Sequence, residues 1–324
     1  MCTGIFLKTK NGKYVFARTL EFGMPLKWIQ FCSYKIKGTV GYFQNDTQNG
    51  FMTDGVNING LFVGTFYYPH YDNQYSKHKI NGKVNIETGN LNLYLLDNCK
   101  SVQDVINILH TLNIIETKID SIAFSLHWIV CDIKGNCIVI EVKNKKTVYY
   151  YNKHNIITNS PSFPRHIVDL KNYKFLSKYN KPGSISEGTG ALGLPGDSSS
   201  QSRFVRANFF RKNMPIPENT SSGIDALLRI MHNFDIPLGS VVDPKNEKKE
   251  VTQYTVAYSL NNIYSQYADY GYIMDRSSNW KQTRKPVKIC NSEGITILLL
   301  LLVIFILCAQ FCQTSWSFIR SDSW

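Results

Sequence analysis

Cys2 is the residue whose type and position most directly suggest chemistry, because it follows the initiator Met1. Removal of Met1 would leave a free α-amine and a thiol on one residue. An α-amine has an ordinary pKa of about 7.7–8.0, so part of it is neutral at pH 7 and can accept the thiol proton. The thiolate can then attack a carbonyl carbon, and the protonated amine can return the proton to the leaving group. Cys2 is therefore a candidate N-terminal nucleophile, against the alternative of an incidental cysteine.

A hairpin at the N-terminus would bring charged residues to Cys2. Asn11-Gly12 lies between two strand-like runs and is a strong hairpin signal, because both residue types tolerate positive φ. A two-residue turn there pairs Cys2 with Glu21 on one sheet face, where the carboxylate can hold the Cys2 ammonium. The same register points Arg18 to the other face, so a bulge or the end of the ladder must intervene if Arg18 is to contact Cys2. The alternative interpretation is that Arg18 is a surface arginine on a strand and Glu21 a solvated acid after the strand end.

Several segments of the chain share their order and approximate spacing with one family of enzymes. The opening MCTGIF is followed by these segments: FARTLEF at 16–22, DGVNINGLFV at 54–63, LHWIVCDIKGNCIVIE at 126–141, TNSP at 158–161 and GLPGDSSSQSRFVRA at 193–207. Together they resemble the choloylglycine hydrolases and penicillin V acylases, from residue 2 to about residue 275. These enzymes are N-terminal-nucleophile cysteine hydrolases of linear amides.

The resemblance implies a role for four residues that match the family's segments. Cys2 would be the nucleophile and, through its amine, the base. Arg18 would flank the thiolate and stabilise it by charge. Asn159 in TNSP would polarise the scissile carbonyl as an oxyanion-hole donor. Arg203 would stabilise charge in the site, with Arg206 as the neighbouring alternative.

Two positions depart from the family's pattern. Glu21 stands where the family has an aspartate near the amine, and its extra methylene can move the carboxylate. Tyr67 in GTFYY stands where bile-salt hydrolases carry asparagine and some penicillin acylases carry tyrosine. A tyrosine hydroxyl can still donate into an oxyanion hole. The tyrosine at position 67 argues against a strict bile-salt hydrolase. The alternative interpretation is that Tyr67 is an aromatic residue on a Tyr-rich strand edge without a role in catalysis.

The pattern of hairpins and helices predicts an α+β domain. Hairpin signals recur at Asn59-Gly60 and Lys134-Gly135, and Ser101 is a candidate helix cap before VQDVINILHTL. Further helices are expected after Ser222 and over SSSQSRFVRANFFRK, while residues 180–200, rich in Gly, Ser and Pro, predict a mobile loop. Sheets covered by helices are a layered arrangement. The family resemblance specifies it as the four-layer αββα sandwich of N-terminal-nucleophile hydrolases, over residues 1–280.

Composition narrows the class of protein further. The 324 residues are 43% hydrophobic, enough for a large core, and carry a net charge of +12 that is scattered along the sequence. This charge indicates a solvated Lys-rich surface or weak attraction to anionic membranes, and no nucleic-acid motif accompanies it. The eight cysteines and seven histidines show no metal spacing. His127 is interpreted as a core residue, Asp54 and Asp132 as turn residues, and the resemblance implies neither metal nor cofactor.

The C-terminal region differs from the rest of the chain. Residues 281–294 hold a basic cluster, residues 295–312 are apolar, and residues 313–324 form a short tail. An apolar run of this length is close to the roughly 20 residues that a spanning helix needs. The positive-inside rule puts the basic cluster, and with it the main domain, on the cytosolic side. We expect a single-pass C-terminal membrane anchor; the alternative is a very apolar buried helix or strand.

The sequence as a whole predicts a membrane-anchored amidase. It would hydrolyse an amphiphilic, apolar acyl amide through a thioester on Cys2, resembling penicillin V acylases or N-acyl lipid and bile-salt amidases. One alternative is a catalytically silent membrane-anchored binding protein of the same fold, and Glu21 is its main support. Another is an acyltransferase that uses the same thioester. Family members are often oligomeric, so a homo-oligomer is also open.

Overall fold

Two antiparallel sheets form the centre of the molecule in the computed structural model, which describes residues 1–283 except 24–25, 44–49, 70–73, 117, 120–121, 124, 184, 245–246, 263–265 and 275–279. The first sheet has the order β14-β1-β2-β17-β18-β19. Its strands are β1 (Cys2–Lys8), β2 (Tyr14–Glu21), β14 (Ile156–Ile157), β17 (Thr252–Ser259), β18 (Gln266–Met274) and β19 (Trp280–Thr283). β1 and β2, which carry the predicted nucleophile and Arg18, therefore lie inside this sheet.

The second sheet has the order β13-β12-β11-β6-β5-β4-β3. Its strands are β3 (Leu26–Cys32), β4 (Ile36–Phe43), β5 (Phe51–Asn57), β6 (Phe62–Tyr67), β11 (Leu126–Cys131), β12 (Cys137–Lys143) and β13 (Lys146–Tyr151). Three short pairs lie outside both sheets: β7 (Val84–Glu87) with β8 (Leu112–Ile115), β9 (Lys118–Ile119) with β10 (Ile122–Ala123), and β15 (Val241–Val242) with β16 (Lys249–Glu250). The predicted hairpins at Asn59-Gly60 and Lys134-Gly135 are confirmed as the β5–β6 and β11–β12 connections.

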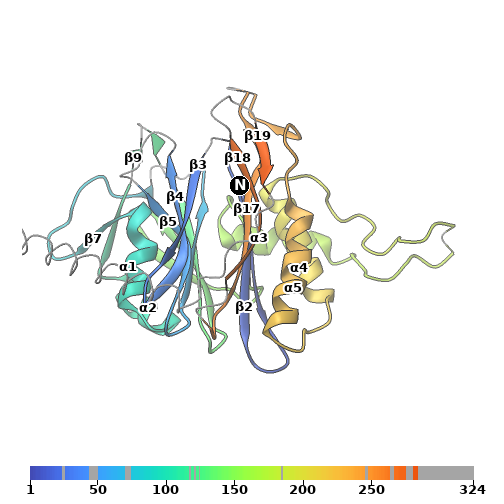
Figure 1. Cartoon of the computed structure of the whole chain (residues 1–324), viewed down its shortest axis with the longest axis horizontal. Coiled ribbons are helices and arrows are strands. Elements are labelled where there is room, and N and C mark those ends of the chain that lie inside the picture. The colour runs from blue at the N-terminus through green and yellow to red at the C-terminus, as the bar shows by residue number, and fades with distance from the viewer. Residues whose placement is uncertain are drawn as a thin grey trace, which may run out of the picture. The chain divides into compact units, whose positions relative to one another are not determined.

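Helices cover the outer face of each sheet, which gives four layers (Figure 1). α1 (Leu91–Asn98) and α2 (Val102–Leu109) lie on the second sheet, and α4 (Ser200–Asn213) and α5 (Thr220–Met231) on the first, beside α3 (Phe163–Asp169). Single 3-10 turns are η2 (Thr88–Asn90), η3 (Leu170–Tyr173) and η4 (His232–Phe234). Ser101 caps α2 as predicted, by accepting from the Asp104 amide at 3.3 Å. α5 begins earlier than predicted, because Asn219 and Ser222 form a capping box. The αββα prediction is confirmed for the described residues.

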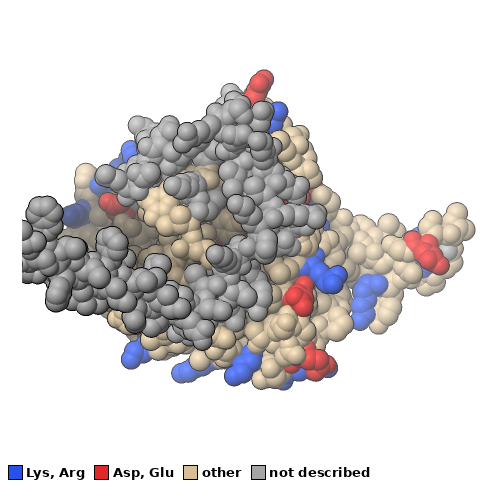
Figure 2. Space-filling view, in the orientation of Figure 1, with Lys and Arg blue, Asp and Glu red and all other residues tan. Residues whose placement is uncertain are grey.

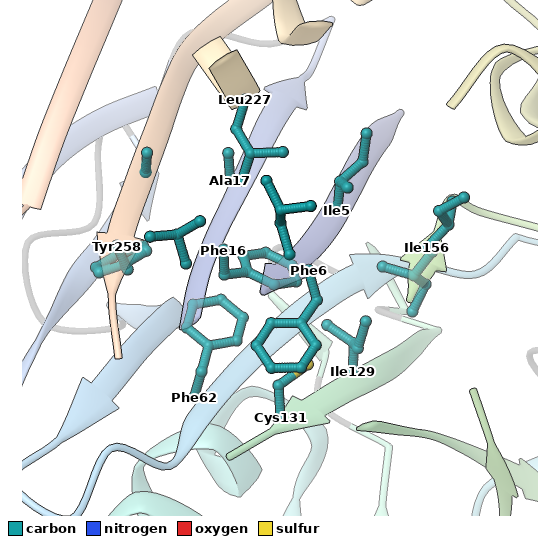
Figure 3. Close-up of a cluster of buried hydrophobic side chains, with 14 of the residues drawn as sticks. Ile5, Phe6, Phe16, Ala17, Phe62, Ile129, Cys131, Ile156, Leu227 and Tyr258 are labelled. Atoms are coloured by element: carbon teal, nitrogen blue, oxygen red, sulfur yellow. The ribbon is translucent and has the colours of Figure 1, made fainter. Parts of the chain in front are cut away.

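The space between the two sheets is filled by aromatic side chains. Phe16 of β2 stacks on Phe62 of β6, with ring centroids 4.0 Å apart. On the other face of the first sheet, Ile5 and Ala17 lie in the same buried cluster as Leu227 of α5 (Figure 3). Because β1 and β2 are buried on both faces, their sequences show no hydrophobic–polar alternation. This burial fixes the strands that carry the site.

The register of the β1–β2 hairpin differs by one residue from the predicted register. Cys2 is opposite Leu20, and Gly4 is opposite Arg18. The loop holds three residues, since the Thr9 amide donates to Lys13 O at 2.9 Å and Gly12, at φ +77, donates to Thr9 O at 3.0 Å. A one-residue shift moves every side chain to the other face. Arg18 therefore lies on the same sheet face as Cys2, and no bulge is needed to bring them together. Glu21 lies on the opposite face.

The described residues include only the first three positions, 281–283, of the predicted C-terminal region. All of them belong to one compact unit, Met1–Val287, and β19 ends at Thr283, inside the predicted linker 281–294. Within the described ranges, no helix has the length and hydrophobicity needed to cross a bilayer. The predicted anchor at 295–312 and the tail at 313–324 lie outside these ranges. On the face seen in Figure 2, Lys and Arg are dispersed among Asp and Glu.

Candidate active site

Cys2, Asn159 and Arg203 meet at the start of β1. The Cys2 nitrogen donates to Asn159 Oδ1 at 2.7 Å. Arg203 donates from Nη1 to the Cys2 carbonyl oxygen and from Nη2 to Asn159 Oδ1, the latter at 2.6 Å. Asn159 follows β14, which pairs with β1, and Arg203 lies in the first turns of α4, which packs on β1. Three segments distant in sequence are thus brought to one buried cysteine.

Met1 is present in the structure, so Cys2 N is a peptide nitrogen that stands where the α-amine of a processed chain would be. The Met1 amino group donates to Glu21 O at 2.7 Å and lies 3.5 Å from Glu250 Oε2. The Glu21 amide donates back to Met1 O at 2.8 Å. Met1 therefore extends the β1–β2 ladder by one residue, and its removal would expose the Cys2 nitrogen next to Asn159.

Arg18 is a fully buried cation beside Cys2. Its Nη1 donates to Thr53 O at 3.0 Å, to Thr65 O at 2.9 Å and to Asp54 Oδ2 at 3.1 Å, while Nη2 has no partner among the described residues. Burial lowers the pKa of Arg18, but attraction to Tyr254, Cys2 and Asp54 outweighs burial, so the pKa is raised overall. Arg18 therefore stays charged, and its unpartnered Nη2 can serve a developing negative charge.

Asp54 anchors Arg18, which corrects its interpretation as a turn residue. Asp54 lies within β5 and is fully buried. The Tyr254 hydroxyl donates to Asp54 Oδ2 at 2.6 Å, and the Tyr258 hydroxyl donates to Oδ1. Burial, followed by the charge of Asp54, raises the pKa of both tyrosines, so they remain protonated donors. Sequence reasoning missed both tyrosines; their even spacing in one strand, which puts them on one face, was the available signal.

Glu21 is buried near the N-terminus but on the sheet face opposite Cys2. Its Oε1 accepts from Thr252 Oγ1 at 3.3 Å, and Oε2 has no partner among the described residues. Burial raises the pKa of Glu21, while the N-terminal amine and Arg203 act against this rise. The Met1 amine contacts the carbonyl oxygen of Glu21, and its ion-pair partner among the described residues is Glu250. The predicted role of the Glu21 carboxylate stays a prediction.

Tyr67 lies beside Asn159 through its main chain. Asn159 Nδ2 donates to Tyr67 O at 2.7 Å, which leaves one Nδ2 hydrogen for another acceptor. Tyr67 and Cys2 also line a small cavity of about 40 Å³ whose other walls are mostly apolar, including Leu20, Phe51 and Leu126. The predicted hydroxyl donor role of Tyr67 stays a prediction.

A buried polar frame holds Asn159 from behind. The Asn159 amide donates to Ser200 Oγ at 2.9 Å, and His166 Nε2 lies 2.9 Å from Asn159 O. His127 Nε2 lies 2.9 Å from Thr158 O, in keeping with its predicted place in the core. Burial lowers the pKa of His166 to about 4, so its ring is neutral at pH 7 and can donate to Asn159 O. His166 and Ser200 were not singled out in the sequence.

The two neighbouring arginines of α4 have different surroundings. Arg203 contacts Cys2, as described, whereas Arg206 Nη1 donates to Pro195 O at 2.8 Å and to Asp197 O at 2.6 Å. Arg206 thus holds the loop before α4, and Arg203 is the one at the site. Across the residues that the structure describes, no group of three or more His, Cys, Asp or Glu side chains could hold a metal ion.

The four-layer fold is that of the N-terminal-nucleophile hydrolases. Residues 2–273 match the model of the linear amide C-N hydrolases, choloylglycine hydrolase family. The chain therefore belongs to this family and is an amidohydrolase acting on linear amides. The predicted family is confirmed, and the alternative of a catalytically silent binding protein finds no support in these comparisons.

Relatives and a solved structure agree over most of the chain. An uncharacterized protein of Paramecium bursaria Chlorella virus 1 is 36% identical over 281 residues, which cover 83% of this chain and 98% of the relative. A bile salt hydrolase/transferase of Clostridium perfringens is 32% identical over 290 residues, covering 80% and 86%. The crystal structure of the mutant C2A conjugated bile acid hydrolase from Clostridium perfringens has a TM-score of 0.71 at 28% identity, covering 88% and 92%.

Proposed function

We propose that this protein, after loss of Met1, hydrolyses a linear amide of an apolar acyl group through a thioester on Cys2. The observation that supports this most is the hydrogen bond from Cys2 N to Asn159 Oδ1, in a site flanked by Arg18 and Arg203. The bond holds the nitrogen that becomes the α-amine, and so fixes the base relative to the sulfur. Two buried cations next to the cysteine favour the negative charges that the reaction develops.

The proposed reaction begins with transfer of the Cys2 Sγ proton to the α-amine. The thiolate forms a bond to the amide carbon, and the carbonyl electron pair moves to oxygen. The remaining Asn159 Nδ2 hydrogen, and Tyr67 as a further donor, would stabilise this oxyanion. The C–N bond then breaks as the leaving nitrogen takes the proton from the α-ammonium. Water adds to the thioester, the α-amine accepts its proton, and the C–S bond breaks to release the carboxylic acid.

The substrate class that we propose is an amphiphilic amide with an apolar acyl part. Most side chains around the small cavity at Cys2 are apolar, Leu20, Phe51 and Leu126 among them, and Glu21 also lines it. A mostly apolar lining is typical of sites that bind hydrocarbon groups. N-acyl lipids, conjugated sterol acids and penicillin V all offer such an acyl group next to a linear amide. The bile salt hydrolase/transferase relative supports the sterol-acid member of this group.

Intact-mass measurement tests the nucleophile directly. The full chain, expressed without an N-terminal tag, is incubated with penicillin V, a bile-salt conjugate and an N-acyl lipid. We expect loss of Met1 and an acyl adduct or turnover, both acyl signals disappearing in Cys2→Ala. A chain that loses Met1 yet neither acylates nor turns over any of these amides would contradict the proposed substrate class, and turnover that survives in Cys2→Ala would contradict the nucleophile.

Acyl transfer is a second candidate function, because the Clostridium perfringens relative is a bile salt hydrolase/transferase. Transfer and hydrolysis differ only in whether an amine or water attacks the thioester. Adding an amine such as glycine to the turnover assay separates them. An N-acyl glycine product that grows with amine concentration at the expense of the free acid indicates transfer; its absence assigns the reaction to hydrolysis.

We also propose that residues 295–312 anchor the enzyme in a membrane, with the catalytic domain in the cytosol. The apolar run and the preceding basic cluster support this. An anchor would hold the site near amphiphilic substrates. Fractionation of cells that express the full chain, followed by alkaline extraction and protease protection, tests the proposal. Release by alkali, or protection of the domain from protease added to the cytosolic side, would contradict it.

A further inference from the structure

A large groove lies on the helix-covered side of the first sheet, away from Cys2. It has a volume of about 810 Å³ and is bounded by the end of β1, the α3–η3 segment, α4 and the chain after α4. Leu7 and Lys8 of its wall stand at the opposite end of β1 from Cys2. At about 3.3 Å per residue, the length of β1 separates the two places by about 20 Å. The groove is therefore distinct from the cavity at the nucleophile.

Apolar side chains form part of the groove floor, next to the polar Asn208 and Asn213. α4 contributes Val205 and Phe209, four residues apart and so on one helix face, and Leu7 of β1 is adjacent. Met214 and Ile216 continue the apolar surface after α4, and Ile216 is 59% exposed. Leu7, Val205 and Phe209 are buried at the base of the groove, whereas Ile216 lies at its open edge.

The rim of the groove carries charge of one sign only. Its lining includes six cationic residues and no acidic one: Lys8, Lys153, Lys171, Lys174, Arg211 and Lys212. None of these six forms an ion pair with a residue that the structure describes. The acids nearby in sequence are already paired elsewhere, Asp169 with Arg165 at 2.8 Å and Glu218 with Lys10 at 2.5 Å. Among the described residues, therefore, no ion pair neutralises the positive charge of the rim.

We propose that this groove binds a single-chain anionic amphiphile, a long-chain carboxylate, with its chain on the floor and its carboxylate among the lysines. Charge complementarity selects an anion, and the apolar floor selects a hydrocarbon chain. The volume lies within the roughly 300–1,000 Å³ usual for small-molecule sites. The concave shape favours one enclosed molecule over a bilayer surface, against which a flat or convex face would pack. The proposal does not depend on the reaction at Cys2.

Photo-crosslinking tests the groove on the full chain. The probe is dodecanoate with a diazirine near its methyl end, and mass spectrometry maps the adducts. We expect adducts in the peptides that contain Phe209 and Met214, displaced by unlabelled dodecanoate and at least tenfold less well by dodecanol, which has the same chain but no charge. Each methylene removed from the competitor should weaken it by up to about fourfold.

Two variants with equal charge change separate the groove from general electrostatics. Lys171→Glu with Lys174→Glu should reduce groove labelling at least fivefold, whereas Lys143→Glu with Lys146→Glu, exposed on the second sheet, should not. Ile216→Asn, also exposed, should reduce labelling by dodecanoate without moving the Cys2 site. Equal labelling in both reversal variants, or adducts confined to the surroundings of Cys2, would overturn the proposal. So would labelling that anionic vesicles abolish, or crosslinks showing a second copy of the chain over the groove.

Discussion

Replacing Asp54 with asparagine tests whether a buried ion pair holds Arg18 beside Cys2. Arg18 Nη1 and Asp54 Oδ2 are 3.1 Å apart, and both side chains are fully buried. Removing one partner of a buried pair leaves the other charge uncompensated, which costs about 3–5 kcal/mol. Tyr254 and Tyr258 also donate to Asp54, and a weakened bond adds about 1 kcal/mol each. We expect Asp54→Asn to lower the free energy of unfolding by about 5–7 kcal/mol.

The assay is urea unfolding of the full chain followed by tryptophan fluorescence, with an exposed pair as control. Lys10 and Glu218 are paired at 2.5 Å with side chains 57% and 70% exposed, so Glu218→Gln should cost less than about 1 kcal/mol. The double variant Arg18→Met with Asp54→Asn should be more stable than the two single effects predict, because no buried charge is left alone. A cost for Asp54→Asn equal to that of the control, or additive single effects, would refute the reasoning.

Three further changes test the surroundings of the site. Burial raises the pKa of Glu21, so the ionised carboxylate lowers the stability of the folded chain at high pH. Glu21→Gln should therefore raise the urea midpoint at pH 8. This gain should vanish at pH 4, where the carboxyl group is protonated in both the folded and the unfolded chain. Burial lowers the pKa of His166 to about 4 from 6.5, so its contribution to stability is complete above pH 6.5 and is lost as pH falls towards 4. His166→Gln should remove up to about 3 kcal/mol of this pH dependence, measured by unfolding at pH 7 and pH 4. A Cβ on Gly4 would lie 2.7 Å from the Phe66 ring, so Gly4→Ala should lower the melting temperature at a cost of about 1–3 kcal/mol, whereas Gly196→Ala, with open space around it, should not.

Local sequence signals predicted several turns and helices of the fold, but they could not predict which distant strands pair. The hairpin turns and the Ser101 cap are set by residues within a few positions of one another, so the sequence alone identifies them. The pairing of β2 with β17 joins residues more than 200 positions apart, and no periodicity in either strand specifies its partner. The four-layer arrangement came from the family resemblance, and the membrane anchor stays a prediction.

At the site, the residue types were predictable but their geometry was not. The Asn11-Gly12 turn was recognised, yet its loop length was wrong by one residue, and this moved Arg18 and Glu21 to the wrong faces. Asp54 was misread because an aspartate before glycine usually marks a turn. Only the burial of β5 against Arg18 shows that its carboxylate is a charge partner. Whether an aspartate lies in a turn or pairs with a buried charge depends on tertiary packing, which a local sequence pattern does not specify.

The balance of buried charge at the site explains why the substitution of glutamate for the family's aspartate is compatible with the proposed chemistry. Arg18 and Arg203 are both fully buried. Burial lowers the pKa of Arg203, but an arginine keeps its charge at neutral pH. Asp54 offsets Arg18 alone. Glu21 is the first of the acids that act on Arg203, and burial raises the pKa of Glu21. A proton on Glu21 would therefore leave less negative charge opposite Arg203, next to Cys2, where the proposed thiolate and oxyanion would form.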